Sequence, residues 1–296
     1  MLGQSLIIGL YLLLFLVVFG CVLLWRRHQR QDRRPFPHQL KLLRGPGETQ
    51  LQRVRTLEER ALVHFFLALS LPPAAALILL WVTTRFSGSA QLIGLVAVVL
   101  GLLAALFFAA RYLIAKIEES NNRYLGFFGE RMVAESLEPL KQEGWRVFHD
   151  VPCGDANTPF NIDHVVVGPG GVFAVETKTR RKGRSRDGFA AHEIIYDGQV
   201  LAYPWGEDRH GLDQALRQAR WLEDWLAQLL GRRAAVRAIL TFPGWQIIRR
   251  GNGPILVLSP KEIIAAVRPA GMTTLSPKEQ DLIAQQLDTR CRDVEF

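Results

Sequence analysis

Long apolar runs in the first 110 residues constrain this chain more than any other feature. No charged residue occurs from Met1 to Trp25, and two further uncharged runs cover Phe65–Thr84 and Ser87–Ala110. A helix needs roughly 20 apolar residues to cross the hydrocarbon core of a bilayer, so each run is long enough to span it. We therefore predict a membrane anchor in residues 1–115. Its three transmembrane helices are expected at about 5–25, 63–84 and 89–111.

The first run has a second interpretation, as a cleaved signal peptide. Signal peptides begin with positive charge and have a short apolar core. Here the apolar stretch Leu6–Leu24 is long, and the arginines follow it. These differences favour a transmembrane helix.

The distribution of Lys and Arg predicts an orientation, because cytoplasmic loops are enriched in both. One basic residue, Arg85, separates the second and third runs, whereas the loop 26–60 is strongly basic. This loop contains Arg26, Arg27, Arg30, Arg33, Arg34, Lys41, Arg44, Arg53, Arg55 and Arg60. We expect this loop and everything after about residue 111 to be cytoplasmic, with the N-terminus outside. Such an anchor suits a bacterial inner membrane.

The net charge of +8 and the pI near 9.7 indicate a polyanionic partner. Nucleic acid and anionic lipid headgroups both qualify. Each arginine of the loop 26–60 attracts anionic lipid by about 1 kcal/mol near a membrane surface, so membrane lipids are the first expected partner of that loop and nucleic acid is the second. Cys21, Cys153 and Cys291 are scattered without a CxxC spacing, which supports neither a disulfide framework nor a zinc site.

Residues 116–296 have the pattern of a mixed α/β domain with a central sheet. Apolar periodicity predicts helices at 116–144, 210–230, 260–267 and 276–287, the last with Ser276 as its N-cap. Strands are predicted at 145–151, 161–167, 172–178, 193–196, 199–201, 234–242 and 255–258.

Three charged side chains fall on the predicted hairpin of strands 161–167 and 172–178. Because side chains alternate along a strand, Glu176 and Lys178 share one face. Asp163 lies on the partner strand, and the turn at 168–171 brings it to the same end of the hairpin. Two carboxylates and an ammonium group are therefore expected to converge.

Such a group suits metal-assisted phosphate chemistry. Carboxylate oxygens, with the Thr177 carbonyl and water, are the hard ligands that Mg²⁺ or Mn²⁺ prefers. The metal would polarise a phosphate oxygen and activate water. Lys178 could orient that water or offset the developing negative charge. The alternative is a surface ion pair of little energetic value.

The sequence around these residues resembles the nuclease-related domain (NERD) family of the PD-(D/E)xK phosphodiesterase superfamily. The resemblance covers about residues 120–260. It rests on Gly129-Glu130, on 161–169 (NIDHVVVGP), on 171–178 (GVFAVETK) and on Gln214-Ala215. Ile162 stands where the superfamily motif has proline, which leaves the Asp163 ligand intact.

The resemblance implies a restriction-endonuclease-like fold, in which a central mixed sheet is flanked by helices. It also implies that Asp163 and Glu176 bind metal, that Lys178 assists catalysis, that Glu130 joins the metal ligands and that Gln214 supports the site. Glu130 could instead be a favourable acid at a helix start, and Gln214 could be an ordinary surface residue. His164 faces away from Asp163 and is expected to be structural.

A strongly basic segment follows the hairpin and consists of Arg180, Arg181, Lys182, Arg184 and Arg186. Its position next to the predicted site favours contact with a phosphate backbone, without sequence preference. The leading hypothesis is a membrane-anchored, metal-dependent nuclease acting on DNA or RNA at the cytoplasmic face. The alternatives are a nucleic-acid tether on the same fold and a membrane scaffold that binds proteins. The oligomeric state stays open.

Overall fold

The computed structural model describes residues 17, 19–21, 24, 41–155, 157–186, 188, 190–268 and 275–294. Apart from isolated residues, the expected transmembrane helix at 5–25 lies outside this part of the chain. So do residues 26–40 of the basic loop.

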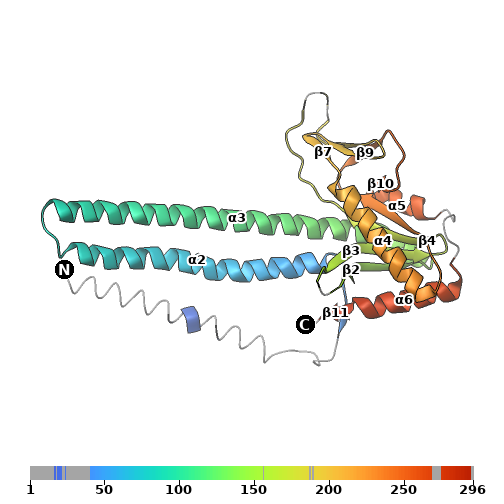
Figure 1. The fold of residues 1–296 in the computed structure, drawn as a ribbon, viewed down its shortest axis with the longest axis horizontal. Helices are drawn as coiled ribbons and strands as arrows, with labels where there is room; N and C mark the ends of the chain where they lie inside the picture. The colour runs from blue at the N-terminus through green and yellow to red at the C-terminus, as the bar shows by residue number, and fades with distance from the viewer. Residues whose placement is uncertain are drawn as a thin grey trace. The chain divides into compact units, whose positions relative to one another are not determined.

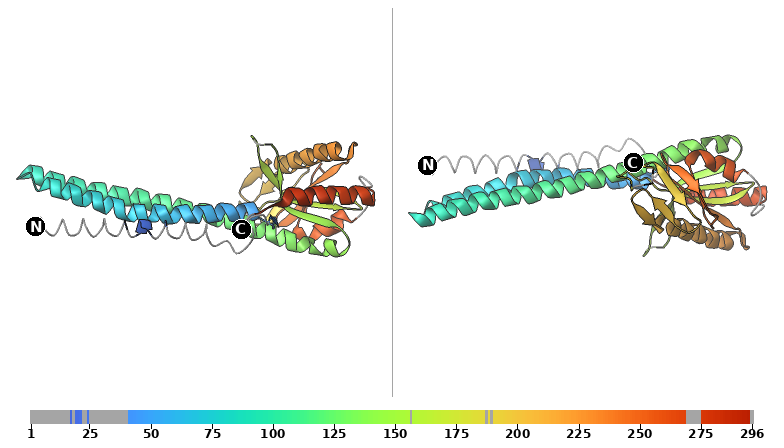
Figure 2. Two further views of the ribbon diagram at one scale, coloured as in Figure 1. Left: turned by 90° about the horizontal axis from the view of Figure 1, so that it is seen from below. Right: turned by 90° about the horizontal axis from the view of Figure 1, so that it is seen from above.

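Two long helices dominate the first compact unit, which includes residues 53–122. Helix α2 (Glu48–Thr83) and helix α3 (Ser89–Gln142) lie side by side and are joined by a short turn (Figures 1 and 2). Their most apolar 18-residue windows have mean hydropathies of 2.2 and 2.9, and only 12% and 6% of these windows are buried. Both helices are therefore long and apolar enough to cross a membrane.

The helices are longer than the sequence pattern indicated. Helix α2 begins at Glu48, so the last part of the expected basic loop is helical. Helix α3 continues to Gln142, where we expected one helix to end near residue 111 and another to begin near 116. No proline lies between Ser89 and Pro139, and the backbone has no other reason to stop.

The second compact unit takes in the described residues of 40–52 and 123–295. Its main sheet has the strand order β10-β8-β4-β3-β2. The pairs β2–β3 and β3–β4 are antiparallel, and β4–β8 and β8–β10 are parallel, which makes the sheet mixed as expected. The strands are β2 (Arg146–Cys153), β3 (Phe160–Gly168), β4 (Gly171–Thr177), β8 (Val236–Thr241) and β10 (Leu256–Leu258).

Helices cover both faces of this sheet (Figure 1). On one face, α3 and α5 (Pro260–Val267) bury Leu137 and Ile263 against Phe173 and Val175. The other face is covered by α4 (His210–Leu230) and α6 (Pro277–Cys291). Helix α6 begins with the expected Ser276 cap, in a capping box that Glu279 completes.

Two smaller sheets were not anticipated. One has the order β7-β6-β5-β9, and the other pairs β1 with β11. Strand β9 was missed because its partner β5 lies about 50 residues earlier in the chain, and a parallel pairing over that distance leaves no local signal. These strands are β1 (Leu42–Leu43), β5 (Glu193–Tyr196), β6 (Leu201–Tyr203), β7 (Gly206–Asp208), β9 (Gln246–Arg249) and β11 (Arg292–Val294).

Candidate functional site

The hairpin β3–β4 has the register that the sequence indicated. His164 pairs with Val175, and Gly168 pairs with Gly171 across the turn. The next position along this register sets Asp163 opposite Glu176. Val172 and Ala174 belong to the core under α4 and α6, whereas Phe173 and Val175 belong to the core under α3. Glu176 therefore continues the alternation towards α4.

Glu176 and Lys178 form an ion pair at the end of β4. The distance from Lys178 Nζ to Glu176 Oε1 is 2.6 Å, and the two side chains are 19% and 2% exposed respectively. Lys178 Nζ also donates to Gln214 Oε1 at 2.7 Å. The structure thus brings together three of the five predicted residues, and helix α4 supplies the third.

Gln218 was not predicted, yet it holds the other oxygen of Glu176. Its Nε2 donates to Glu176 Oε2 at 2.6 Å and to the Asn161 carbonyl at 3.0 Å. Residues four apart share one face of a helix, so the position of Gln214 already contained the signal. Gln218 Oε1 is buried without a hydrogen-bond partner among the described residues.

Asp163 lies next to this cluster and is held by the backbone. Its Oδ2 accepts a hydrogen bond from the Thr177 amide at 2.7 Å. Burial raises the pKa of Asp163 well above its usual value, and the carboxylates of Glu176 and Glu130 raise it further. The site therefore crowds negative charge that a cation would relieve.

Glu130 is buried in the interior of α3 and not at a helix start, because α3 begins some 40 residues earlier. Burial, followed by the carboxylates of Asp150 and Glu176, raises the pKa of Glu130 to about 8. Gly129 lets the helix pass close to the hairpin. A Cβ at Gly129 would lie 1.9 Å from the Thr179 side chain.

Arg44, just before α2, and the first turn of α2 reach the same region. Asp150 Oδ2 accepts from the Thr49 amide at 2.9 Å and from Thr49 Oγ1 at 2.7 Å, and it pairs with Arg44 at 3.0 Å. Asn161 Nδ2 donates to Asp150 Oδ1 at 2.7 Å. Because Gln218 bonds the Asn161 carbonyl, a continuous polar network joins Arg44 to Glu176. Gln50 also hydrogen-bonds Glu130 and lowers its pKa.

The oxygen atoms of this site suit a hard divalent cation, although they do not yet surround one ion position. Asp163, Glu176 and Glu130 offer carboxylate oxygens, and the buried Gln218 Oε1 lacks a donor. Within the ranges that the structure describes, no three His, Cys, Asp or Glu side chains are already grouped around one ion position. The three-carboxylate ligand set therefore stays a prediction.

In the basic segment after β4, some side chains contact the rest of the domain and others are exposed to solvent. Arg186 donates to the carbonyls of Pro204 and Tyr203 at 3.3 and 3.2 Å, so its guanidinium supports the fold. Arg180 pairs with Asp208 at 3.3 Å, and Lys182 lies 5.9 Å from the centre of the Trp245 ring. Arg181 and Arg184 are exposed.

His164 is fully buried, in line with its expected structural role. Its Nδ1 lies 2.8 Å from Nδ1 of His149 on the neighbouring strand β2. Burial lowers the pKa of His164 well below its usual value, and burial with the nearby Lys141 lowers that of His149 to about 4. Both rings are therefore neutral at pH 7.

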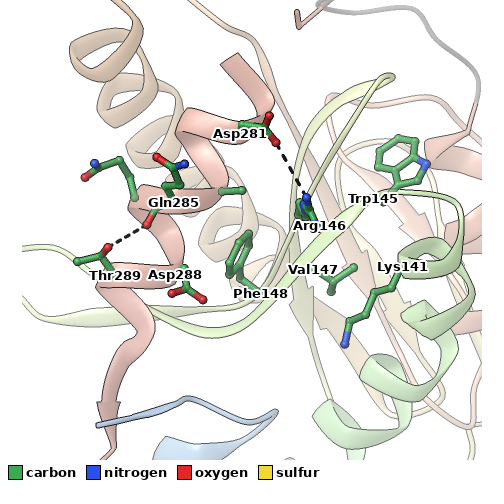
Figure 3. Close-up of a pocket in the computed structure, with 11 residues that line it drawn as sticks. Lys141, Trp145, Arg146, Val147, Phe148, Asp281, Gln285, Asp288 and Thr289 are labelled. Carbon is green, nitrogen blue, oxygen red and sulfur yellow. Dashed lines mark hydrogen bonds and ion pairs between the residues drawn. The ribbon is translucent and has the colours of Figure 1, made fainter. Parts of the chain in front are cut away.

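Cavities of different size lie on this unit. One of about 490 Å³ is lined by Gln214, Gln218, Arg217, Phe160 and Trp221, together with Thr158 and Pro159, so it opens beside the Glu176 cluster. A larger one, of about 720 Å³, lies where α6 passes β2 and the end of α3 (Figure 3). It contains none of the predicted site residues, whereas Gln214 lines the smaller cavity.

Part of the chain matches a known protein family. The sequence pattern of the nuclease-related domain (NERD) family matches residues 125–243. This range includes the β3–β4 hairpin, Glu130, Gln214 and Gln218. Searches of curated proteins and of solved structures gave no match.

Proposed function

The chain carries a nuclease-related domain in residues 125–243, and on this premise we propose that it is a metal-dependent phosphodiesterase that cleaves DNA or RNA. The observation that carries the proposal is the Glu176–Lys178 ion pair, in which the buried carboxylate and the half-buried ammonium group are each fixed by a glutamine of α4. A surface ion pair contributes little to stability. The pKa values of the neighbouring Asp163 and Glu130 are raised by burial and by the adjacent carboxylates, which is typical of functional sites.

The proposed roles follow from these contacts. Asp163, Glu176 and Glu130 would hold Mg²⁺ or Mn²⁺, which supplies polarisation of the phosphate and activation of water when bound. Gln218 orients the Glu176 carboxylate, and Gln214 orients the Lys178 ammonium group. That ammonium group stabilises the charge that develops on the phosphate.

A second candidate is a tether that binds nucleic acid without cutting it. It is favoured by the lack of a preformed group of three metal ligands among the described residues. In this case Lys178 would neutralise Glu176 and bind a phosphate. The same experiment separates the two candidates.

The test uses the full chain in detergent, with single- and double-stranded DNA and RNA and with Mg²⁺ or Mn²⁺. We expect cleavage that EDTA stops and that Glu176→Ala and Lys178→Ala each reduce at least about 100-fold. Glu135→Ala, at an exposed carboxylate of the same helix as Glu130, is the matched control. Equal cleavage by all variants would indicate a contaminant. Binding without cleavage would support the tether.

We further propose that α2 and α3 anchor the domain in a membrane, with the domain in the cytoplasm of a bacterial cell. Their apolar, exposed surfaces support the anchor, and the excess of Lys and Arg outside the apolar runs supports the orientation. Anionic lipids are then a second partner, through the basic residues before α2.

A further inference from the structure

The basic segment after β4 lies against a cluster of aromatic rings, formed by Tyr203, Trp205, Phe242 and Trp245. Trp205 stacks on Tyr203 with a centroid distance of 5.3 Å and an interplanar angle of 15°. Trp245 meets Trp205 edge-on at 5.6 Å, and Phe242 meets Tyr203 at 6.0 Å. This basic–aromatic platform lies close to the proposed site, because the Lys178 amide bonds the carbonyl of Thr241, next to Phe242.

Trp205 differs from the other rings in its exposure. It is 42% exposed, whereas Tyr203 and Trp245 are 2% and 5% exposed. Among the described residues of 133–281 no other large apolar side chain is so open. One face of the indole is supported by Tyr203, and much of the ring is left for contact with another molecule.

The segment is held in place around these rings. The Trp245 Nε1 donates to the Arg180 carbonyl at 3.2 Å, and Arg186 donates to two carbonyls beside Trp205. Gly183 passes the indole so closely that a Cβ there would contact the ring at 3.5 Å. The backbone that carries the charged residues between these anchors is therefore held next to the exposed ring.

Positively charged side chains lie in the same segment as the backbone that passes the Trp205 ring. Lys182 lies over Trp245, and Arg181 and Arg184 have no acidic or hydrogen-bonding partner in the part of the chain that the structure describes. Exposed cations next to an exposed aromatic ring are the two elements of single-strand binding, since cations contact phosphates and rings stack on bases.

We propose that the platform binds single-stranded nucleic acid, with an unpaired base stacked on Trp205 and phosphates on Arg181, Lys182 and Arg184. This inference rests on the proposed function and names its substrate class. A base inside a duplex is covered by its neighbours and cannot reach Trp205, so a fully paired substrate would lose this contact. Because every base has a π-face, the preference is for strandedness and not for sequence.

A membrane surface is the alternative to nucleic acid, because it also binds exposed tryptophan and arginine side chains. Interfacial binding depends on several apolar side chains together. Among the described residues of 178–208, Trp205 is the sole large apolar side chain that is exposed, and it is packed rigidly on Tyr203. The platform therefore suits a stacked base better than a lipid layer.

The test measures binding in EDTA, so that it does not depend on catalysis. The full chain in nanodiscs is titrated into fluorescein-labelled dT20 and into a 20-base-pair duplex, over a series of salt concentrations. We expect Trp205→Ala to weaken dT20 binding between about 5- and 150-fold, with duplex binding unchanged and with Trp205→Phe restoring most of the affinity. Leu282→Ala, at an exposed apolar residue of α6, is the control.

The salt dependence separates stacking from charge. For a single strand, each phosphate contact contributes about −0.7 to the slope of log K against log salt. Arg181→Ala and Arg184→Ala should each reduce the slope by about that amount, whereas Trp205→Ala should leave it unchanged. A general loss of structure would change both the slope and the intercept.

Each remaining outcome decides one of the two proposals. Unchanged dT20 binding by Trp205→Ala overturns this inference alone, as does equal weakening of duplex binding. Brominated anionic lipid quenches the fluorescence of a tryptophan that it contacts. If it quenches emission that is missing in Trp205→Phe, and if Trp205→Ala binds dT20 as the wild type does, the platform binds lipid. If dT20 binding depends on Trp205 but no substrate is cleaved, the inference stands and the catalytic proposal fails. If the wild type binds no oligonucleotide in EDTA, this inference fails, and the cleavage assay with Mg²⁺ or Mn²⁺ decides the catalytic proposal on its own.

Discussion

At the scale of single residues, the geometry gives Gln218 a testable role. Glu176 is 2% exposed, and Gln218 is the donor to its second oxygen. Gln218→Ala leaves that oxygen buried without a donor, at a cost of about 1–3 kcal/mol in stability. It also frees the carboxylate to rotate. Under the proposed function, in which Glu176 would hold the metal, we expect cleavage to fall about 10- to 100-fold.

Initial rates and thermal midpoints of full-length protein measure both effects. Gln228→Ala, at an exposed glutamine of the same helix, is the matched control. A Gln218→Ala protein that keeps the wild-type rate would show that the contact to Glu176 is not needed.

The His149–His164 pair predicts how stability depends on pH. Both pKa values are lowered by burial, that of His149 to about 4. Below pH 6.5 the unfolded chain therefore binds more protons than the folded one, and the stability that is full above this pH is lost as the pH falls towards 4. The loss is on the order of 3 kcal/mol for His149 alone.

The comparison protein is His149→Leu/His164→Leu, in which both polar partners are replaced together. The raised pKa values of Asp163 and Glu130 act in the opposite sense, since their contribution is lost as the pH rises. They are common to both proteins and cancel in the difference. The difference in thermal midpoint between the two proteins should change steadily from pH 6.5 to 4. A constant difference would mean that the pair does not titrate.

At the scale of elements, the short segment before α2 belongs to the folded domain. Arg44 contacts two carboxylates, Asp150 with 4% exposure of its side chain and Asp293 with 43%. Asp150 also adopts a left-handed backbone with φ of 48°, which its hydrogen bonds to Thr49 and Asn161 stabilise. The same guanidinium thus forms one buried and one exposed ion pair.

We expect these two pairs to differ in stability. Asp150→Asn removes one partner of a buried pair, which costs about 3 kcal/mol. This corresponds to a decrease of about 6–12 °C in the thermal midpoint. Asp293→Asn removes an exposed partner and should cost less than about 1 kcal/mol. Scanning fluorimetry of both variants measures this, and equal midpoints would refute the special role of the segment.

The elements that the sequence predicted well are those with strong local signals. Helix α4 has the predicted bounds, because its apolar face repeats without interruption, and α6 begins at a complete capping box. The β3–β4 register followed from one turn. The contributions of Asp150 and Gln50 could not be foreseen, because they depend on contacts about 80–100 residues apart in the chain. Strand β9 was missed for the same reason.

At the scale of the whole molecule, the two apolar helices are the basis of the proposed membrane anchor. Helices α2 and α3 each contain an apolar 18-residue window that is largely exposed, and a turn at residues 84–88 joins them. An exposed apolar surface of this extent is unfavourable in water. If both helices cross a membrane, the turn and the nuclease-related domain must lie on opposite sides of it.

Two reporter fusions test this arrangement. A reporter after Phe296 should be active in the cytoplasm, since Lys and Arg flank the apolar parts of α2 and α3 more densely at their domain ends than at the turn, where only Arg85 lies. The same reporter inserted after Ser87 should be active on the outer side. Both reporters on one side would mean that the two helices do not span, and an outer C-terminus would separate the domain from cytoplasmic nucleic acid. The membrane would then no longer explain the segregation of apolar and basic residues along the chain.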